Sequence, residues 1–413
     1  MPEAGLSTIE RVCQVMDRPL RPLDYALILH FGRPPDGARL RLGALSARNL
    51  YPRTGSFIDG TEWRRLEVTG DGLAVRQAAG SPVEAIQEFM RVPFRLASEA
   101  PVRQLLVQHD AHRACLVTRV HHVAGDLLST LMWVRHQLRV ASGRDPCVVE
   151  AAPFGPLRLR RPPSRALRNP LAYRGRCEPI WTQAAKPSPE RKWMAFRIEV
   201  SEFLGLSRDR DGFTYNDVLL TCALDAFHWW NSRHGAADRK VGVWVPMNIR
   251  EEPFRGFGNG TSRIRVHRRF AEGGSFRAKC RQVRRQVDGS RRHGEWAVPE
   301  KHILTRLPFR LSTPLLRGYL NRPWADMGSA AVTHVEKWPG QMDAEFDDVC
   351  GIEVIGALDL RHALMIAAVT DRGATSVTLT CDPALLGVDD AGLIGERLEH
   401  LVLAAKRELR CAP

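Results

Sequence analysis

A run of apolar and β-branched residues at 114–120 leads directly into two histidines, His121 and His122, and an aspartate follows at Asp126. The next residues, 127–139, carry apolar side chains at helical spacing. The chain is therefore predicted to turn from a strand into a helix here, with two imidazoles and a carboxylate at the corner. Because neighbouring residues of a strand point to opposite faces, the two histidines are predicted to point to opposite sides.

The length of the chain, 413 residues, exceeds that of one ordinary core and predicts two domains of roughly 200 residues each. Strand and helix patterns mix along residues 1–150, which are expected to form an N-terminal α/β lobe that carries the histidine pair. Proline and arginine crowd together over residues 151–190 and predict a solvated connection; the alternative is a docking surface for an acidic partner. Residues 191–413 are expected to form the C-terminal lobe.

The charge balance favours anionic partners. The 60 Lys and Arg residues against 46 Asp and Glu give a net charge of +14, which suits nucleic acid, phosphorylated cofactors or an acidic protein. The sequence has no long Lys/Arg block flanked by stacking aromatic residues and no recognisable nucleic-acid module. We therefore expect no nucleic-acid partner.

Cysteine spacing and hydropathy predict the compartment. The nine cysteines are widely spaced and include no C-x-x-C pair, which supports neither a zinc site nor a disulfide framework, so no metal is expected. The N-terminal segment lacks the apolar core of a signal peptide, and no uninterrupted apolar run of about 18 residues occurs. We expect a cytoplasmic, reduced protein that is a monomer and has no membrane span.

A neutral histidine at the predicted corner can act as a general base, because its free ring nitrogen can take the proton of an alcohol or amine that attacks a carbonyl. Such catalysis is worth on the order of 10²–10⁴ in rate. The sequence has no G-x-S-x-G nucleophile motif, and no cysteine lies beside a histidine. Direct transfer between two bound substrates is therefore favoured over a covalent acyl-enzyme. For either histidine taken alone, packing in the core is the commoner role.

Two residues beside the histidines allow more than one role. Asp126 begins the predicted helix, where a carboxylate commonly caps the N-terminus; paired with a distant arginine, it would instead brace the corner. Gly125 lets the loop pass close to a substrate or supplies a backbone N–H to a developing oxyanion. The glycine-rich run 256–260 lacks the strand-GxGxxG-helix pattern of a phosphate loop and predicts a flexible turn.

The pattern His121-His122-x-x-x-Asp126 resembles the motif of the condensation-domain superfamily, which also includes the chloramphenicol acetyltransferases, the wax ester/diacylglycerol acyltransferases and the polyketide-associated acyltransferases. Further segments resemble the family's PFDL, PPLR, TVNDVLLA, PVNLR and GN segments: residues 93–96 (PFRL), 100–103 (APVR), 214–220 (TYNDVLL), 245–250 (VPMNIR) and 258–259 (GN). The resemblance spans nearly the whole chain. Leu127 stands where the family usually has glycine, and Arg95 where it has aspartate.

This resemblance implies an α/β fold of two chloramphenicol acetyltransferase-like lobes, each a mixed sheet with flanking helices, which form a V with a central tunnel. His122 would lie midway along the tunnel and act as general base or position the attacking group. Asp126 would have a structural role through a salt bridge, for which Arg250 is the expected partner. Asn248, beside it, is expected to support the substrate or the structure.

The resemblance also implies the substrates. No bound cofactor is expected; an acyl thioester linked to coenzyme A or to phosphopantetheine would be the co-substrate, and an acidic carrier protein would act in trans. An alcohol or amine would be the acceptor. Ser329 and Thr333 occupy the place of the family's second-lobe crossover strand and are weaker substrate-binding candidates. The expected function is an acyltransferase that forms an ester or amide in natural-product biosynthesis; the alternative is a non-catalytic condensation-like domain that recruits a partner protein.

Overall fold

The computed structural model describes most of the chain. The described residues are 5–67, 72–78, 80–109, 112–145, 160, 177–183, 186–203, 205–206, 211–236, 240–251, 257–269, 274–294, 307–320, 330–335, 346, 348–358 and 362–410. Most of the predicted connection 151–190 lies outside them, as does Ser329.

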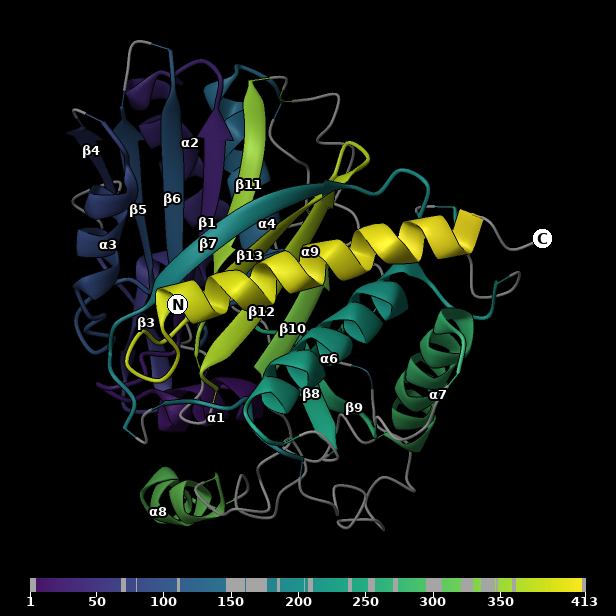
Figure 1. Ribbon diagram of the computed structural model, residues 1–413. Coiled ribbons are helices and arrows are strands. Elements are labelled where there is room, and N and C mark those ends of the chain that lie inside the picture. The colour runs from purple at the N-terminus through teal and green to yellow at the C-terminus, as the bar shows by residue number, and fades with distance from the viewer. Residues whose placement is uncertain are drawn as a thin grey trace.

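The strand that ends at the histidines lies at the centre of a five-stranded sheet with the order β11-β1-β6-β5-β4 (Figure 1). Its strands are β1 (Asp24–Phe31), β4 (Leu73–Gln77), β5 (Val102–Gln108), β6 (Ala114–His121) and β11 (Val349–Ile355). β5 and β6 form an antiparallel hairpin, and β1 pairs with the other edge of β6. The corner after β6 is therefore fixed by neighbours on both sides.

Helices cover both faces of this sheet. On one face, α2 (Gly37–Leu50) and α4 (Leu127–Ala141) pack against each other and against the strands. On the other face, Ile86 of α3 (Val83–Arg91) shares a buried cluster with Ile28 and Val117. Alternate side chains of β1, β5 and β6 thus lie in two separate apolar layers, as a buried strand requires.

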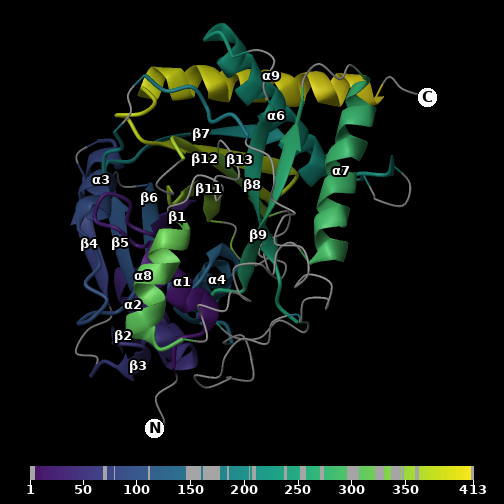
Figure 2. The same cartoon turned by 90° about the horizontal axis from the view of Figure 1, so that it is seen from below.

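The second sheet has six strands in the order β7-β13-β12-β10-β8-β9. They are β7 (Lys192–Glu199), β8 (Val241–Asn248), β9 (Thr261–Arg268), β10 (Ala330–Val335), β12 (Leu364–Asp371) and β13 (Ala374–Cys381). The sheet is mixed, because β10 runs parallel to β8 and β12 whereas the other pairs are antiparallel. Helices α6 (Tyr215–Arg233), α7 (Phe276–His293) and α9 (Val388–Arg410) lie together on one side of it (Figures 1 and 2).

Smaller elements complete the described fold. They are α1 (Thr8–Met16), the 3-10 helix η1 (Pro52–Gly55), β2 (Ser56–Asp59), β3 (Glu62–Arg65) and α8 (Phe309–Leu320). β2 and β3 form a hairpin, and α8 packs beside α1 (Figure 2). Among the residues described, no helix is both long enough and apolar enough to span a bilayer.

β11 departs from the predicted division of the chain. Its residues fall in the range 191–413, yet it pairs antiparallel with β1 in the first sheet. Beside it, the backbone N–H groups of Val354 and Gly356 donate to the hydroxyls of Thr378 and Thr380 of β13 at 3.1 and 2.9 Å. The predicted boundary therefore does not hold for this strand, which belongs to the first sheet and connects it to the second.

Candidate functional site

The corner between β6 and α4 has the geometry expected from the sequence. β6 ends at His121, and α4 begins at Leu127 with Asp126 as its N-cap. The Asp126 carboxylate accepts a hydrogen bond from the backbone N–H of Ser129 at 3.1 Å. Both candidate histidines and the carboxylate therefore lie in one short turn.

His121 is buried and held from several sides. Its Nδ1 accepts a hydrogen bond from the backbone N–H of Val123 at 3.2 Å, so the ring proton lies on Nε2, which is 3.3 Å from Asp17 Oδ1. The ring of Phe94 lies edge-on to it at 5.9 Å between centroids. Burial acts to raise the pKa of Asp17, but hydrogen bonds from the His121 ring and from the backbone N–H of Leu23 outweigh it and lower that pKa.

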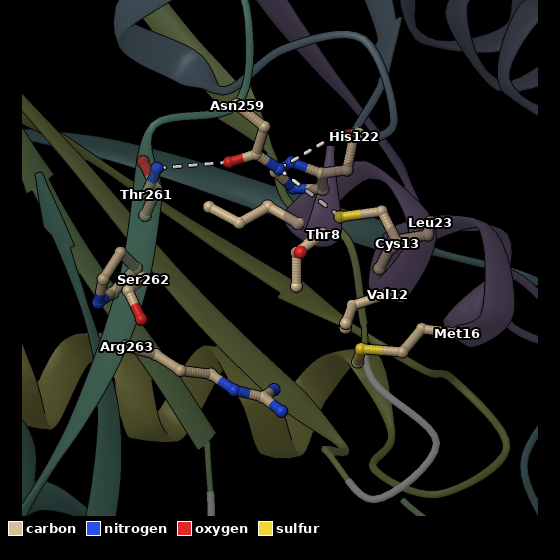
Figure 3. A pocket seen from close by; sticks show the side chains of 12 residues that line it. Thr8, Val12, Cys13, Met16, Leu23, His122, Asn259, Thr261, Ser262 and Arg263 are labelled. Atoms are coloured by element: carbon tan, nitrogen blue, oxygen red, sulfur yellow. Dashed lines mark hydrogen bonds between the residues drawn. The ribbon is translucent and has the colours of Figure 1, made fainter. Parts of the chain in front are cut away.

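His122 lies on the other side of the strand end, as strand alternation predicts. Its ring packs against Tyr25 with 4.5 Å between centroids. Its backbone N–H donates to the carbonyl of Leu23 at 2.9 Å, and its own carbonyl accepts from Nδ2 of Asn259 at 2.9 Å (Figure 3). Asn259 lies just before β9 of the second sheet, and Leu23 lies just before β1 of the first sheet. Residues next to both sheets therefore position His122.

The environment of His122 keeps its ring neutral. Burial is the main cause that lowers its pKa to about 4, and the neighbouring imidazole of His121 lowers it further. The carboxylates of Asp126 and Asp24 and a backbone hydrogen bond with Gly125 act in the opposite direction but are weaker. At neutral pH the imidazole therefore has an unprotonated nitrogen, which is what a general base needs.

His122 lines a pocket of about 190 Å³. α1 forms one wall, and the start of β9 with the residues just before it forms the opposite wall (Figure 3). The lining residues are mostly apolar or uncharged: Thr8, Ile9, Val12, Cys13, Met16, Leu23, His122, Pro246, Asn259, Thr261, Ser262 and Arg263. A substrate group in this pocket would lie against the candidate base.

Asp126 and Arg250 form a buried ion pair. Nη2 of Arg250 lies 2.6 and 2.7 Å from the two carboxylate oxygens. Oδ2 of Asp126 also accepts from the backbone N–H of Gly260 at 3.0 Å and from the hydroxyl of Thr261 at 2.6 Å. Burial acts to raise the pKa of Asp126, but the Arg250 charge and these hydrogen bonds outweigh it and lower that pKa. The structure thus brings together the carboxylate and the arginine expected to partner it.

Arg250 also connects the loop that contains Gly258 to α4. Nη2 of Arg250 also donates to the hydroxyl of Ser129 at 2.9 Å and to the carbonyl of Gly258 at 2.7 Å. Asn248 holds the arginine, since its Oδ1 accepts from the backbone N–H of Arg250 at 3.1 Å and from Nη1 at 3.3 Å. Asn248 is not among the described residues that line the pocket, and its role toward a substrate stays a prediction.

Glycine is required at position 125 because the ring of Phe257 lies close to its Cα. A Cβ at this position would lie 2.7 Å from the ring of Phe257, nearer than a Cβ can come to another atom. Residues 257–260, the described part of the predicted flexible turn, are buried, and 257–258 form a bend; their flexibility stays a prediction. The ring, rather than a substrate, fills the space beside the glycine Cα; use of the Gly125 N–H toward an oxyanion stays a prediction.

Other candidates lie elsewhere. Thr333 is half-buried on β10, pairs in register with Ala367 and does not line the pocket. Ser329 lies outside the described residues. Within the part of the chain that is described, no group of three or more His, Cys, Asp or Glu side chains could hold a metal ion.

The sequence analysis missed the wall formed by α1. Ser7 accepts a hydrogen bond from the N–H of Glu10 at 3.3 Å, and the Glu10 carboxylate accepts from the N–H of Ser7 at 2.6 Å. This reciprocal capping box has the sequence pattern S-x-x-E, and apolar residues follow it at helical spacing. That pattern was the available signal for the helix.

No model of a protein family matches this sequence, and no curated protein matches it. Solved structures do match. The first condensation domain of the calcium-dependent antibiotic synthetase, in complex with a substrate analogue, has 17% identity and a TM-score of 0.72, with 97% of this chain and 96% of that chain covered.

Two further structures match over nearly the same length. The starter condensation domain of rhizomide synthetase, in complex with C8-CoA and Leu-SNAC, has 13% identity and a TM-score of 0.69, with 98% and 94% of the two chains covered. The X-domain from teicoplanin biosynthesis has 16% identity and a TM-score of 0.65, with 98% and 96% covered. The chain therefore has the mixed α/β fold of the condensation domains.

Proposed function

We propose that this protein is an acyltransferase that forms an ester or amide from an acyl thioester and an alcohol or amine. The observation that carries the proposal is His122: a neutral imidazole that lines a largely apolar pocket at the end of a central strand. The condensation domains of the same fold support the class of reaction, since one of them was solved with C8-CoA and Leu-SNAC.

In the proposed reaction, the unprotonated nitrogen of His122 takes the proton of the alcohol or amine as that group attacks the thioester carbonyl. A carbon–oxygen or carbon–nitrogen bond forms, the carbon–sulfur bond breaks, and the proton passes from His122 to the departing thiolate. Asp126 and Arg250 take no part in these steps. Their ion pair holds the loop of Asn259, which in turn holds the backbone of His122.

The donor is either an acyl-coenzyme A or an acyl group on a carrier protein. The net charge of +14 suits both the phosphates of coenzyme A and an acidic carrier protein. Natural-product biosynthesis is the proposed setting, because the similar structures come from an antibiotic synthetase and from rhizomide and teicoplanin biosynthesis.

The test is mass spectrometry of reactions that combine matched acyl-coenzyme A and acyl-carrier donors with a panel of alcohols and amines. We expect an ester or amide product with the wild-type protein and none above background with His122→Ala. Equal product from both proteins would overturn the role of His122. If folded wild-type protein gave no product with any combination of donor and acceptor, the proposal would be overturned for the donor and acceptor classes tested.

One observation favours a second function, in which the domain recruits a partner protein without catalysis. An X-domain from teicoplanin biosynthesis with the same fold was solved as a complex with OxyB. On this alternative, His122→Ala leaves partner binding and biological activity intact. On the proposed function, the same variant loses activity while partner binding is unchanged.

A further inference from the structure

Tyr25 lies beside His122 because of the register of the first sheet. Tyr25 of β1 pairs with Val120 of β6, and His122 comes two residues after Val120, which places it on the same side of the chain. Such residues are diagonal neighbours across two strands, a separation that aromatic side chains can bridge. The two rings lie 4.5 Å apart between centroids, with 39° between their planes. The pairing of the strands therefore brings the phenol ring against the imidazole.

The Tyr25 side chain is also fixed at its far end. Its hydroxyl forms a hydrogen bond of 2.6 Å with the hydroxyl of Thr130, which is buried on α4. Only 2% of Tyr25 is exposed. Burial is the main cause that raises the pKa of the phenol well above its ordinary value, and the charge of Asp126 raises it further. The ring is therefore uncharged around neutral pH and spans from β1 to α4.

The imidazole of His122 is restrained in two ways. A backbone hydrogen bond with Gly125 holds one of its nitrogens, and the ring of Tyr25 packs against it. A general base contributes only within reach of the proton that it takes, and a small misplacement of a catalytic group lowers the rate strongly. A side chain that restrains the imidazole can therefore affect the reaction without contact with the substrate.

We propose that Tyr25 is a positioning residue: its ring supports the imidazole of His122, and its hydrogen bond with Thr130 keeps that support in place. The inference rests on the proposed role of His122 as the base. Tyr25 acts through His122, since it is not among the described residues that line the pocket. Its ring also takes the place of water beside the imidazole, which favours the neutral form.

Other titratable and charged groups approach His122 from several elements. They lie on β1, on β6, at the start of α4, on α1 and on β9, and they are Asp24, His121, Asp126, Cys13 and Arg263. A substitution of Tyr25 alters none of these residues. A change in the pKa of His122 after loss of the ring would therefore report on the ring itself.

Histidine NMR tests the contact without turnover. The ¹³C-labelled ring signal of His122, identified by its loss in His122→Ala, is followed from about pH 8 to about pH 5.5, above the wild-type pKa of about 4. We expect that signal to stay still in wild-type protein. In Tyr25→Leu, water reaches the imidazole and its pKa should rise by more than about one unit, so the signal should move. Tyr25→Met also lacks the ring but fills more of the space, which covers the case of a misfolded leucine variant.

Kinetics test the effect on the reaction. With the best donor and acceptor pair, kcat of Tyr25→Leu should fall about 10- to 100-fold while KM changes by less than about threefold, because the lining of the pocket is kept. Tyr25→Phe keeps the ring and should retain the low pKa of His122 and a kcat within about threefold of wild type, because it loses only a neutral hydrogen bond. A purely structural role would instead reduce the amount of folded protein and leave its kcat and the His122 titration unchanged.

The matched control is Tyr215→Leu, because Tyr215 is also buried beside a histidine, with its ring edge-on to His334 at 5.2 Å between centroids. This variant should leave the His122 titration and kcat as they are in wild-type protein. A His122 signal that stays still in the folded Tyr25→Leu and Tyr25→Met proteins, or that moves equally in Tyr215→Leu, would overturn the proposal. If the signal moves only in the Tyr25 variants but wild-type protein transfers no acyl group, the support of His122 by Tyr25 is confirmed and the acyl-transfer proposal alone fails.

Discussion

His121 and His122 are adjacent in sequence but have different surroundings, because the strand that carries them alternates its side chains. His121 is buried, and its Nε2 lies 3.3 Å from Oδ1 of Asp17, whereas His122 lines the pocket. Burial lowers the pKa of His122 to about 4 and so keeps it neutral. The two residues therefore have different surroundings because they lie on opposite sides of the strand end.

The ion pair of Asp126 gives a prediction for stability. Asp126→Asn keeps the shape of the side chain but leaves the buried Arg250 without its counter-charge, so the free energy of unfolding should fall by about 3–5 kcal/mol in urea titrations. Acyl transfer should fall with it, because the loop that holds His122 is released.

The matched control is Asp59→Asn, which breaks an exposed pair in which Asp59 lies 2.9 Å from Arg64. That change should cost less than about 1 kcal/mol. If the two variants had the same stability, the Asp126–Arg250 pair would not brace the corner.

At the scale of elements, the strand-to-helix corner was predictable because its signals are local. The β-branched run of β6 predicts a strand, and Asp126 is a common type of N-cap. Arg250 could be selected only through the resemblance to condensation domains, because it is 124 positions from Asp126 and no local pattern relates the two.

The elements that were missed depend on distant contacts or on a signal that was not used. β11 has four β-branched residues, a strand signal that was not used, but its place in the first sheet follows only from its pairing with β1, more than 300 residues earlier. The capping box of α1 predicts that a helix begins there, but it does not predict what that helix packs against. The pocket could not be foreseen without α1, because this helix forms one of its two walls.

The capping box of α1 gives a prediction for local stability. Ser7→Ala removes the acceptor for the N–H of Glu10 and should destabilise the helix by about 1 kcal/mol. Hydrogen exchange should therefore quicken at the amides of α1, and ligand binding in the pocket should weaken.

Ser275→Ala serves as its control, since Ser275 caps α7 by accepting from the N–H of Ala278 at 3.3 Å. That variant should quicken exchange in α7 and leave α1 unchanged. Unchanged exchange of the α1 amides in Ser7→Ala would contradict the capping role.

At the scale of the whole molecule, the two sheets share one apolar core. Leu27 and Leu116 of the first sheet belong to the same buried cluster as Leu379 of the second. Arg21, near the N-terminus, forms a buried ion pair of 2.7 Å with Asp382, near the last helix. With β11 between the sheets, these contacts predict that the described parts unfold as one cooperative unit.

His334, which is half-buried on β10, makes that unfolding sensitive to pH. Burial lowers the pKa of His334 from 6.5 to about 4, so the unfolded chain takes up a proton first as the pH falls below about 6.5. The free energy of unfolding should therefore fall between those two values. Between about pH 7 and about pH 5, His334 alone should contribute a loss of about 2 kcal/mol.

His334→Asn should flatten this pH dependence by that amount in urea titrations at the two pH values. The same substitution at His400, which is exposed on α9, should leave the dependence as it is in the wild-type protein. Equal pH dependence in the two variants would contradict the effect ascribed to burial.

The central claim is that His122 acts as the base in acyl transfer, and the most direct measurement is the turnover number of His122→Ala with the best donor and acceptor pair. The account predicts a fall on the order of 10²–10⁴ in kcat, with unfolding that stays cooperative. Turnover within a few-fold of the wild-type rate in the folded variant would contradict it.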